Sequence, residues 1–442
     1  MSLSDKMAAN MDFSAFSKAK DLHKRLWFTL IALIVFRFGT YVPFPGINPN
    51  VLNEFFSSHQ GGLIGMFNAF TGGALSRMSI FALNIMPYIS ASIIVQLGAS
   101  VLPFLMALRK EGEAGFRKIH QYTRMLTILI TVVQAYFMAL ALERGGAVIM
   151  SSPHLFELST IVSLLGGTMF VVWLGEQITA RGVGNGTSLI IMVGIVANIP
   201  SAFVRVLEDG RAGALSTFVV LGVMALVIAV VAIVVCVERA QRRIIIQYPK
   251  RQMGGRLMQG VSSHLPLKIN PTGVMPPIFA SALLALPVGI AQYFAQNSTS
   301  DFWSKTALLL TPGQWVYTLT FGVLIIFFTF FYTGIQQNPK ETAENLKQQG
   351  GFVAGIRPGE NTARYLDYVM TRLTVLGAIY LATLCILPEF IIAALNVPFF
   401  LGGTTVLIVV SVILETFSQI QSHLIAYQYE GLIKKAKLRG KL

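Results

Sequence analysis

Long apolar stretches alternate with short polar ones along almost the whole chain. A hydropathy pass finds ten of them, each close to the length of about 20 residues that a helix needs to cross a bilayer. Because ten is even, the pattern predicts both termini on the same side of a membrane. The predicted spans cover residues 26–42, 78–98, 125–142, 155–174, 187–204, 214–237, 273–294, 315–335, 373–395 and 399–421.

The composition agrees with this pattern. Of 442 residues, 54% are apolar and only 12% are charged, whereas soluble domains carry about a quarter charged residues. Ten crossings consume about 200 residues and leave roughly 240 for loops and tails. The chain is therefore predicted to be an all-α polytopic membrane protein, and a large extramembrane domain is excluded.

Basic residues test the number of spans. The chain has 34 Lys and Arg against 20 Asp and Glu, a net charge of +14. With both termini in the cytoplasm, 28 basic residues fall on the cytoplasmic side and 5 on the other, as the positive-inside rule requires. Two long cytoplasmic loops, 239–270 and 336–371, together with Arg372 directly after the second, hold 12 of the 28. Their charges either set topology or bind anionic lipid, ribosomal RNA or an acidic protein, and their length favours a partner.

The spans divide into two sets of five. This division predicts a cytoplasmic N-tail (1–25), an N-terminal half (26–204), a hinge in the outer loop (205–213), a C-terminal half (214–421) and a cytoplasmic C-tail (422–442). Since five is odd, the halves would be inverted relative to each other, as is common in transporters and channels.

An uncharged segment at 61–73, GGLIGMFNAFTGG, is too short to span and is bracketed by glycine pairs. Irregular backbone at membrane depth is tolerated only when it is buried in protein or lines a water-filled cavity. The segment is either a short re-entrant helix in a cavity mouth or an interfacial loop packed on the outer surface. In the next span, Pro87 is predicted to kink the helix, and Ile85 and Ile89 share one face as core or lipid-facing residues.

Residues that could carry catalysis or ion coupling are sparse. Glu415 lies well inside the last span, and without an obvious partner there it is interpreted as a packed structural residue. No histidine begins an HExxH motif, the RGVGNG sequence at 181–186 is typical of a tight turn, and Cys236 and Cys385 are predicted to be buried and inert. A small-molecule transporter or an intramembrane enzyme would need polar groups that the spans lack. Neither is favoured, and no catalytic residue, cofactor or metal is assigned.

Five segments are distinctive: GGALSRMSIFALNIMPYISASIIVQL (72–97), GTMFVVWLGEQITARGVGNGTS (167–188), ERAQRRIIIQYPKRQ (238–252), SHLPLK (263–268) and NPKETAENLKQQGGFVAGIRPGENTARYLDYVMTRLT (338–374). Together they closely resemble the SecY/Sec61-alpha family, the channel subunit of the protein-secretion translocase, and its bacterial members most of all. The resemblance implies ten transmembrane helices in two inverted five-helix halves around an hourglass pore. It also implies a lateral opening between the second and third and the seventh and eighth helices.

The implied function is that of a protein-conducting channel rather than an enzyme. Such a channel moves unfolded secretory chains across the membrane and releases signal segments sideways into lipid, driven by a motor ATPase or a ribosome. The implied partners are SecE-like and SecG-like small membrane subunits, the SecA motor ATPase, the ribosome, signal sequences, unfolded secretory chains and membrane lipid, but no DNA. The implied location is the bacterial cytoplasmic (inner) membrane, with both termini in the cytoplasm.

The same resemblance assigns site residues. The pore ring falls on Ile85, Ile89, Thr187, Ile191, Ile278 and Ile408. The plug, a re-entrant helix, falls on Gly61, Gly62, Leu63, Ile64, Gly65, Met66, Phe67, Asn68, Ala69, Phe70, Thr71, Gly72 and Gly73. The surface that docks the motor or ribosome falls on Arg242, Arg243, Lys250, Arg251, Arg256 and Arg357, with Arg357 at the family's motor-coupling position.

Two positions depart from the family pattern. Thr187 replaces the usual isoleucine, and its hydroxyl is expected to bond a backbone carbonyl of its own helix, which would make the constriction slightly less apolar. Gly255 stands where an arginine is common and leaves the docking affinity at that point open.

Overall fold

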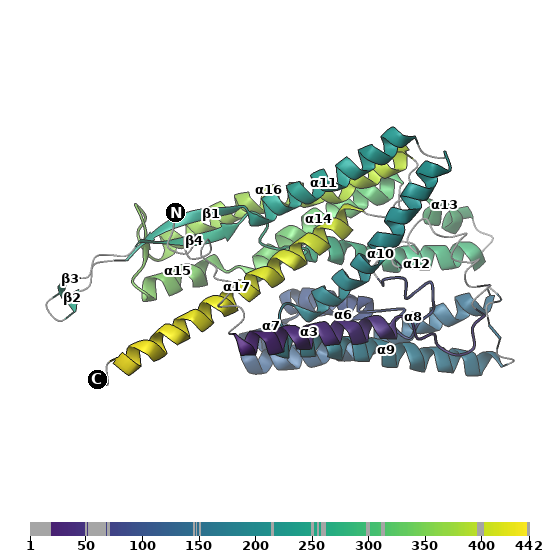
Figure 1. Cartoon of the computed structure of the whole chain (residues 1–442), viewed down its shortest axis with the longest axis horizontal. Coiled ribbons are helices and arrows are strands. Elements are labelled where there is room, and N and C mark those ends of the chain that lie inside the picture. Colours follow the sequence, from purple (N-terminus) through teal and green to yellow (C-terminus); the bar gives the residue numbers. More distant parts are fainter. Residues whose placement is uncertain are drawn as a thin grey trace. The chain divides into compact units, whose positions relative to one another are not determined.

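The chain folds almost entirely into helices (Figure 1). The computed structural model describes residues 19–48, 51, 68, 71–144, 146, 148–149, 152–213, 216–248, 252–253, 256–257, 262–297, 301–310, 314–395 and 402–439. Its helices are α3 (Lys20–Gly39), α6 (Met86–Val101), α7 (Pro103–Lys110), α8 (Glu113–Arg144), α9 (Pro153–Arg181), α10 (Gly186–Arg211), α11 (Thr217–Arg239), α12 (Met275–Asn297), α13 (Asp301–Leu309), α14 (Trp315–Gln336), α15 (Pro339–Gln348), α16 (Glu360–Leu395) and α17 (Gly403–Arg439). Its strands are β1 (Gln241–Gln247), β2 (Gln252–Met253), β3 (Arg256–Leu257), β4 (Ser262–Lys268) and β5 (Phe352–Val353).

The chain forms two compact units. The first unit comprises Met1–Ala91, Gln121–Pro200 and Ile408–Leu442, and the second comprises Ser92–His120 and Ser201–Leu407.

Each of the ten predicted spans overlaps one helix: α3, α6, α8, α9, α10, α11, α12, α14, α16 and α17. Within the described residues, seven helices are long and apolar enough to cross a membrane, or eight if α6 and α7 form one bent span. α3 is not among them because Lys24, Arg25 and Arg37 lie within its 20 residues. The apolar part of α12, Met275–Gly289, is shorter than the others.

The second predicted span differs most from the structure. α6 begins at Met86, and residues 71–85 before it form turns in which Met78 and Asn84 have positive φ. Pro87 therefore lies in the first turn of α6, where a proline has no helical hydrogen bond to lose, and the predicted kink at Pro87 is wrong. The chain bends instead by 92° between α6 and α7, because a residue that precedes a proline is driven out of the helical region. Leu102, with ψ at 121°, is that residue.

The turns at 71–85 are held in the first unit by apolar packing. α3 packs against α9, and the Phe81 ring stacks with Phe36 of α3 at 6.0 Å and with Phe170 of α9 at 5.8 Å. A buried cluster joins these turns to α8 and α9, formed by Phe44, Leu75, Met78, Ala82, Leu83, Ala135, Ala139, Leu142, Phe156 and Leu164. Irregular backbone thus lies against three helices, as membrane depth requires.

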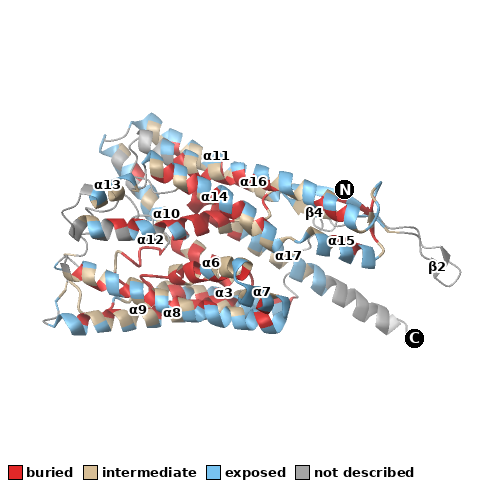
Figure 2. Ribbon diagram, turned by 180° about the vertical axis from the view of Figure 1, so that it is seen from behind, coloured by how far each residue is buried: buried red, intermediate tan, exposed pale blue. Residues whose placement is uncertain are grey.

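In the second unit, α14 packs against both α12 and α16. Buried residues recur along α14 (Figure 2). α11 exposes many large apolar side chains, including Phe218 at 87% and Ile228 at 66%. A soluble protein rarely leaves so many large apolar groups exposed, so this surface is suited to lipid.

The predicted cytoplasmic loops of the second unit form a small lobe with its own core. β1 pairs antiparallel with β4 from Gln241↔Lys268 to Gln247↔Ser262, and with β5 on its other edge, in the order β4-β1-β5. Ile244 and Ile246 alternate along β1 onto one face. They join a buried cluster with Ala343, Leu346, Val353, Ala363 and Leu366 of α15, β5 and α16. Within the described residues, the mostly helical fold therefore carries this three-stranded sheet and a separate two-stranded pair, β2 with β3.

Candidate functional site

The residues predicted for the pore ring lie at the starts of helices. They are Ile85 and Ile89 at α6, Thr187 and Ile191 at α10, Ile278 at α12 and Ile408 at α17. The five isoleucines are buried, with Ile85 and Ile408 only 1% exposed, whereas Thr187 is half-buried. Ile278 belongs to the second unit and the other five to the first.

Thr187 is part of the N-terminal cap of α10. Its Oγ1 donates to Asn185 Oδ1 at 2.7 Å, and the same oxygen accepts the backbone N–H groups of Thr187 at 3.1 Å and Ser188 at 3.4 Å. Asn185 is thus the capping residue, as asparagine often is. The expected bond from the Thr187 hydroxyl to a backbone carbonyl is wrong, because the capping side chain is the nearer acceptor.

The tight turn predicted at 181–186 is confirmed, since α9 ends at Arg181 and α10 begins at Gly186. A Cβ at Gly186 would lie 1.9 Å from a carbonyl oxygen of α9, so only glycine permits this approach. The Val183 amide donates to Thr29 Oγ1 of α3 at 3.0 Å. The Gly184 amide donates to Gln419 Oε1 of α17 at 2.9 Å. The turn between α9 and α10 is therefore hydrogen-bonded to both α3 and α17.

The described part of the predicted plug is its C-terminal end. Asn68, Thr71, Gly72 and Gly73 are described, and Gly61, Gly62, Leu63, Ile64, Gly65, Met66, Phe67, Ala69 and Phe70 lie outside the described residues. Asn68 O accepts the Gly73 amide at 2.9 Å and the Thr71 hydroxyl at 3.2 Å. Asn198 Nδ2 of α10 lies 3.4 Å from the same oxygen.

Two arginines converge on the turn that contains Gly72. Arg37 Nη1 donates to Gly72 O at 2.9 Å and Arg77 Nη2 donates to the same atom at 2.8 Å. Both guanidinium groups lie over the Tyr41 ring, at 4.9 and 4.1 Å from its centroid, a favourable cation–π arrangement. Gly72 has φ +69°, and a Cβ there would lie 2.9 Å from Gly194 Cα. This arginine clamp, Arg37 and Arg77 on Gly72 O, was not anticipated from the sequence.

The described docking residues lie in the two loops that were predicted to be cytoplasmic, and β3 belongs to a two-stranded sheet separate from β4-β1-β5. Arg242 and Arg243 are exposed on β1, and Arg256 lies in β3. Lys250 and Arg251 lie outside the described residues, as does Gly255. Arg357 is exposed in the turn after β5, where its carbonyl oxygen accepts from Thr362 Oγ1 at 2.9 Å. The lobe thus presents cationic side chains on a rigid support.

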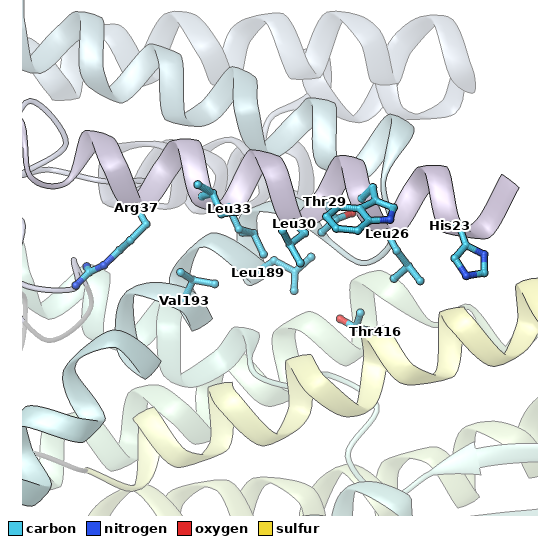
Figure 3. Close-up of a pocket in the computed structure, with 11 residues that line it drawn as sticks. His23, Leu26, Thr29, Leu30, Leu33, Arg37, Leu189, Val193 and Thr416 are labelled. Atoms are coloured by element: carbon cyan, nitrogen blue, oxygen red, sulfur yellow. The ribbon is translucent and has the colours of Figure 1, made fainter. Parts of the chain in front are cut away.

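An apolar groove that the sequence analysis missed lies in the first unit (Figure 3). It has a volume of about 800 Å³ and is lined chiefly by one side of α3, with contributions from α10 and α17. Its lining includes Leu26, Trp27, Leu30, Leu33, Ile34, Leu189, Val193 and Thr416. Trp27 and Ile34 are 62% and 58% exposed, so large apolar groups of α3 are left uncovered.

A second unanticipated contact joins α7 to α14 within the second unit. Arg109 Nη2 donates to Ile335 O, in the last turn of α14, at 2.7 Å. The last carbonyl oxygens of a helix lack intrahelical partners and carry partial negative charge. Arg109 therefore caps α14 from the segment that follows the bend.

Several residues considered for chemistry are structural or surface groups. Glu415 is exposed on α17, so its interpretation as a packed residue is wrong. Cys385 is buried as predicted, but Cys236 is exposed on α11. Among the described residues, no group of three or more His, Cys, Asp or Glu side chains is arranged to hold a metal ion.

Sequence comparison shows what kind of protein this chain resembles. It is 48% identical over 436 residues to protein translocase subunit SecY of Pseudomonas aeruginosa, covering 98% of both chains. It is 50% identical over 431 residues to the same subunit of Vibrio cholerae, covering 97% of both. The Escherichia coli K12 subunit is 49% identical over 434 residues, covering 97% of this chain and 98% of that one.

Solved structures share the fold at low identity. One described as the structure of a protein conducting channel superposes with a TM-score of 0.69 at 18% identity, covering 92% of this chain and 93% of the other. Sec61 in a canine ribosome-channel complex gives 0.66 at 17% identity, covering 92% and 93%. A SecY structure concerned with the plug domain gives 0.65 at 20% identity, with the same coverage.

The family assignment rests on the length of the sequence match. The SecY family profile matches residues 79–417, which include nine of the ten predicted spans almost in full. Members of this family are translocase subunits and not enzymes, which agrees with the spans' lack of catalytic groups. The chain belongs to the SecY family.

Proposed function

We propose that this chain is the channel-forming subunit of a protein translocase. It conducts unfolded secretory polypeptides across the membrane and releases signal or transmembrane segments sideways into lipid. The observation that carries the proposal is the identity of about half of all residues with protein translocase subunits over nearly the whole chain. The structure supports it with helices that expose large apolar side chains and with five buried isoleucines at the proposed pore-ring positions.

The pore ring is formed by Ile85, Ile89, Thr187, Ile191, Ile278 and Ile408. Branched apolar side chains can surround a passing extended chain without binding any of its side chains strongly. A narrow apolar constriction also dewets when it is empty and so resists ion flow. The burial of the five isoleucines supports a role inside the protein rather than against lipid.

The segment 61–73 is the plug of this channel. Support comes from its described end, where Gly72 is held by two arginines. Apolar segments leave the pore between the second and third spans, α6 and α8, on one side, and the seventh and eighth, α12 and α14, on the other. The two inverted halves, 26–204 and 214–421, move about the hinge at 205–213.

The sheet lobe is the docking surface for the SecA motor ATPase and the ribosome. Arg242, Arg243 and Arg357 are exposed there. Lys250, Arg251 and Arg256 belong to the loop 239–270, which also contains Arg242 and Arg243. Cationic groups suit both ribosomal RNA and acidic protein surfaces. One structural relative is described as Sec61 in a ribosome-channel complex.

The apolar groove along α3 receives a helix of a small SecE-like membrane subunit, and a SecG-like subunit completes the complex. A groove of about 800 Å³ with a mainly apolar lining, to which Arg37 and His23 also contribute, is suited to a helix packed side by side in lipid. The chain resides in the bacterial inner membrane with both termini in the cytoplasm. That orientation puts 28 basic residues on the cytoplasmic side and 5 on the other, as the positive-inside rule requires.

Crosslinking to a stalled secretory chain tests the proposal. With Cys236 and Cys385 replaced by serine, single cysteines at Ile278 and Ile408 should crosslink to a chain arrested in transit. A cysteine at exposed Leu221 of α11 is the control and should not. Vesicles holding the idle channel should pass no small solute, and chain transport should require an added motor or ribosome. Solute uptake without either partner would instead support a small-molecule transporter.

A further inference from the structure

A hydrogen-bonded cluster with two buried and two half-buried members lies between the sheet and α12 in the second unit. Asn270, 2% exposed, donates from Nδ2 to Glu238 Oε1 at 2.7 Å and to Gly273 O at 3.1 Å. Its Oδ1 accepts from the hydroxyl of buried Thr272 at 3.0 Å. The amide nitrogen and the amide oxygen of Asn270 therefore both have hydrogen-bond partners inside the protein. We call Glu238, Asn270, Thr272 and Gly273 the Asn270 cluster.

The Asn270 cluster joins three elements that are separate in the chain. Glu238 is in the last turn of α11, immediately before β1. Asn270 and Thr272 connect β4 to α12, and Gly273, with φ +61°, turns the backbone into that helix. The Ile269 amide donates to the Ala240 carbonyl at 3.2 Å, which extends the β1–β4 ladder to the same point. The base of the hairpin and the start of α12 are thus held together.

The parts on either side of the cluster are closely packed. The sheet is fixed to α15 and α16 by the buried cluster that includes Ile244 and Leu366. α12 begins with Met275 and two prolines, Pro276 and Pro277, whose fixed φ leaves the first turn little freedom. A Cβ at Gly377 of α16 would lie 2.9 Å from the Ile269 carbonyl oxygen, so α16 packs directly against the connection between β4 and α12. Few backbone torsions between the sheet and α12 can absorb a displacement of the sheet. The displacement is therefore passed on to α12.

Breaking the cluster is more costly than moving it as a whole. A separated Asn270 and Glu238 would leave a buried amide and a carboxylate without their hydrogen bonds, and unmet buried groups of this kind are strongly unfavourable. If a partner shifts the sheet, the lower-energy response keeps the cluster intact and carries the start of α12 along. Ile278 lies in the first turn of that helix.

We propose that Glu238, Asn270 and Thr272 are positioning residues that transmit movement of the β4-β1-β5 sheet to α12 and so to Ile278. They bind neither the motor nor the passing chain. This inference rests on the proposed function, because the movement in question is produced by a partner docked on the sheet lobe.

The first test separates partner binding from channel opening. Wild-type channel complex and the variants Asn270→Leu and Thr272→Val are placed in vesicles with the SecA motor, ATP and a urea-unfolded secretory precursor. At saturating motor, the transport rate should fall about fivefold in Asn270→Leu, the effect expected when one coupling residue is lost. The half-saturating motor concentration should not change. Thr374→Val, which removes another buried hydroxyl bond, to the Met370 carbonyl at 2.8 Å, should change neither.

The second test is a rescue that is independent of whether Asn270→Leu folds. Asn270→Asp places a second carboxylate against Glu238 and should slow transport. Adding Glu238→Gln restores an amide donor to that pair and should recover most of the rate. A wild-type saturating rate in a folded Asn270→Leu protein, or no recovery in the double variant, would overturn the inference. Absence of motor-driven transport in the wild-type complex would instead count against the proposed function.

Discussion

Arg37 and Arg77, forty residues apart in the chain, donate hydrogen bonds to one carbonyl oxygen, that of Gly72, at 2.9 and 2.8 Å. Arg37 comes from the last turn of α3 and Arg77 from the turns before α6. Both also lie over the Tyr41 ring. The arginine clamp therefore restrains the backbone where the proposed plug segment ends.

Arg37→Leu should loosen this turn. Hydrogen bonds from charged donors contribute about 1.5–3 kcal/mol, so the equilibrium between the held and released turn should shift by about tenfold or more. The expected result is a higher ion conductance of the idle channel in planar bilayers. Arg211→Leu, at the exposed end of α10, is the control for the loss of one arginine. Equal conductance in the two variants would contradict the assigned role.

Thr187→Ile should make the proposed pore ring more apolar. The idle ion leak should fall, because a more apolar constriction dewets more readily, and secretion of chains with weak signal sequences should also fall. Loss of the hydroxyl bond to Asn185 should cost only about 1 kcal/mol of stability. Conductance recordings measure the ion leak, and a secretion assay measures the export of chains with weak signal sequences. If neither changes in Thr187→Ile, the proposed effect of Thr187 on the pore ring is wrong.

Arg357→Glu should block ATP-driven secretion while leaving the protein folded. Arg357 is exposed, and surface substitutions usually change the free energy of unfolding by no more than about 0.5 kcal/mol. Motor-driven transport into vesicles and thermal unfolding in detergent are the two measurements. Lys347→Glu, on exposed α15 in the same lobe, controls for the charge reversal and should still transport. Normal ATP-driven transport in Arg357→Glu would refute the assignment.

Arg109→Met should destabilise the contact between α7 and α14. The substitution removes the bond to the Ile335 carbonyl oxygen, so the free energy of unfolding should fall by about 1.5–3 kcal/mol. Arg109→Lys should recover part of the loss, since it keeps a charged donor. Thermal unfolding in detergent measures this, and Lys110→Met, at the exposed neighbouring position, should have little effect. Equal stability of the two methionine variants would argue against the cap.

Local patterns predicted the helices well but not their ends near turns. Every predicted span overlaps a helix, and the turn at 181–186 was expected from its glycines. The start of α6 at Met86 was not, because residues 78–85 are as apolar as a helix while their turns are held by distant contacts such as Phe36 with Phe81. Pro87 was consequently assigned a kink that it does not make.

The features of the candidate site also divide into those that the sequence suggested and those that only the structure revealed. The resemblance to the family supplied the proposed pore-ring and docking positions, whereas the structure alone placed the groove along α3 and the caps made by Asn185 and Arg109. The partners of such caps are chosen by packing. Asn185 takes the Thr187 hydroxyl because its oxygen is already turned toward the helix start.

By itself, the sequence determined that the chain is a polytopic membrane protein, and its charges predict which side of the membrane holds most of the basic residues. Hydropathy and charge act between each segment and the bilayer, so they can be evaluated one segment at a time. Only the tertiary structure decided that two arginines share Gly72, that Asn270 joins the sheet to α12, and that the loops build a lobe with its own core. These features depend on which buried polar and apolar groups meet after folding, and no local pattern specifies that.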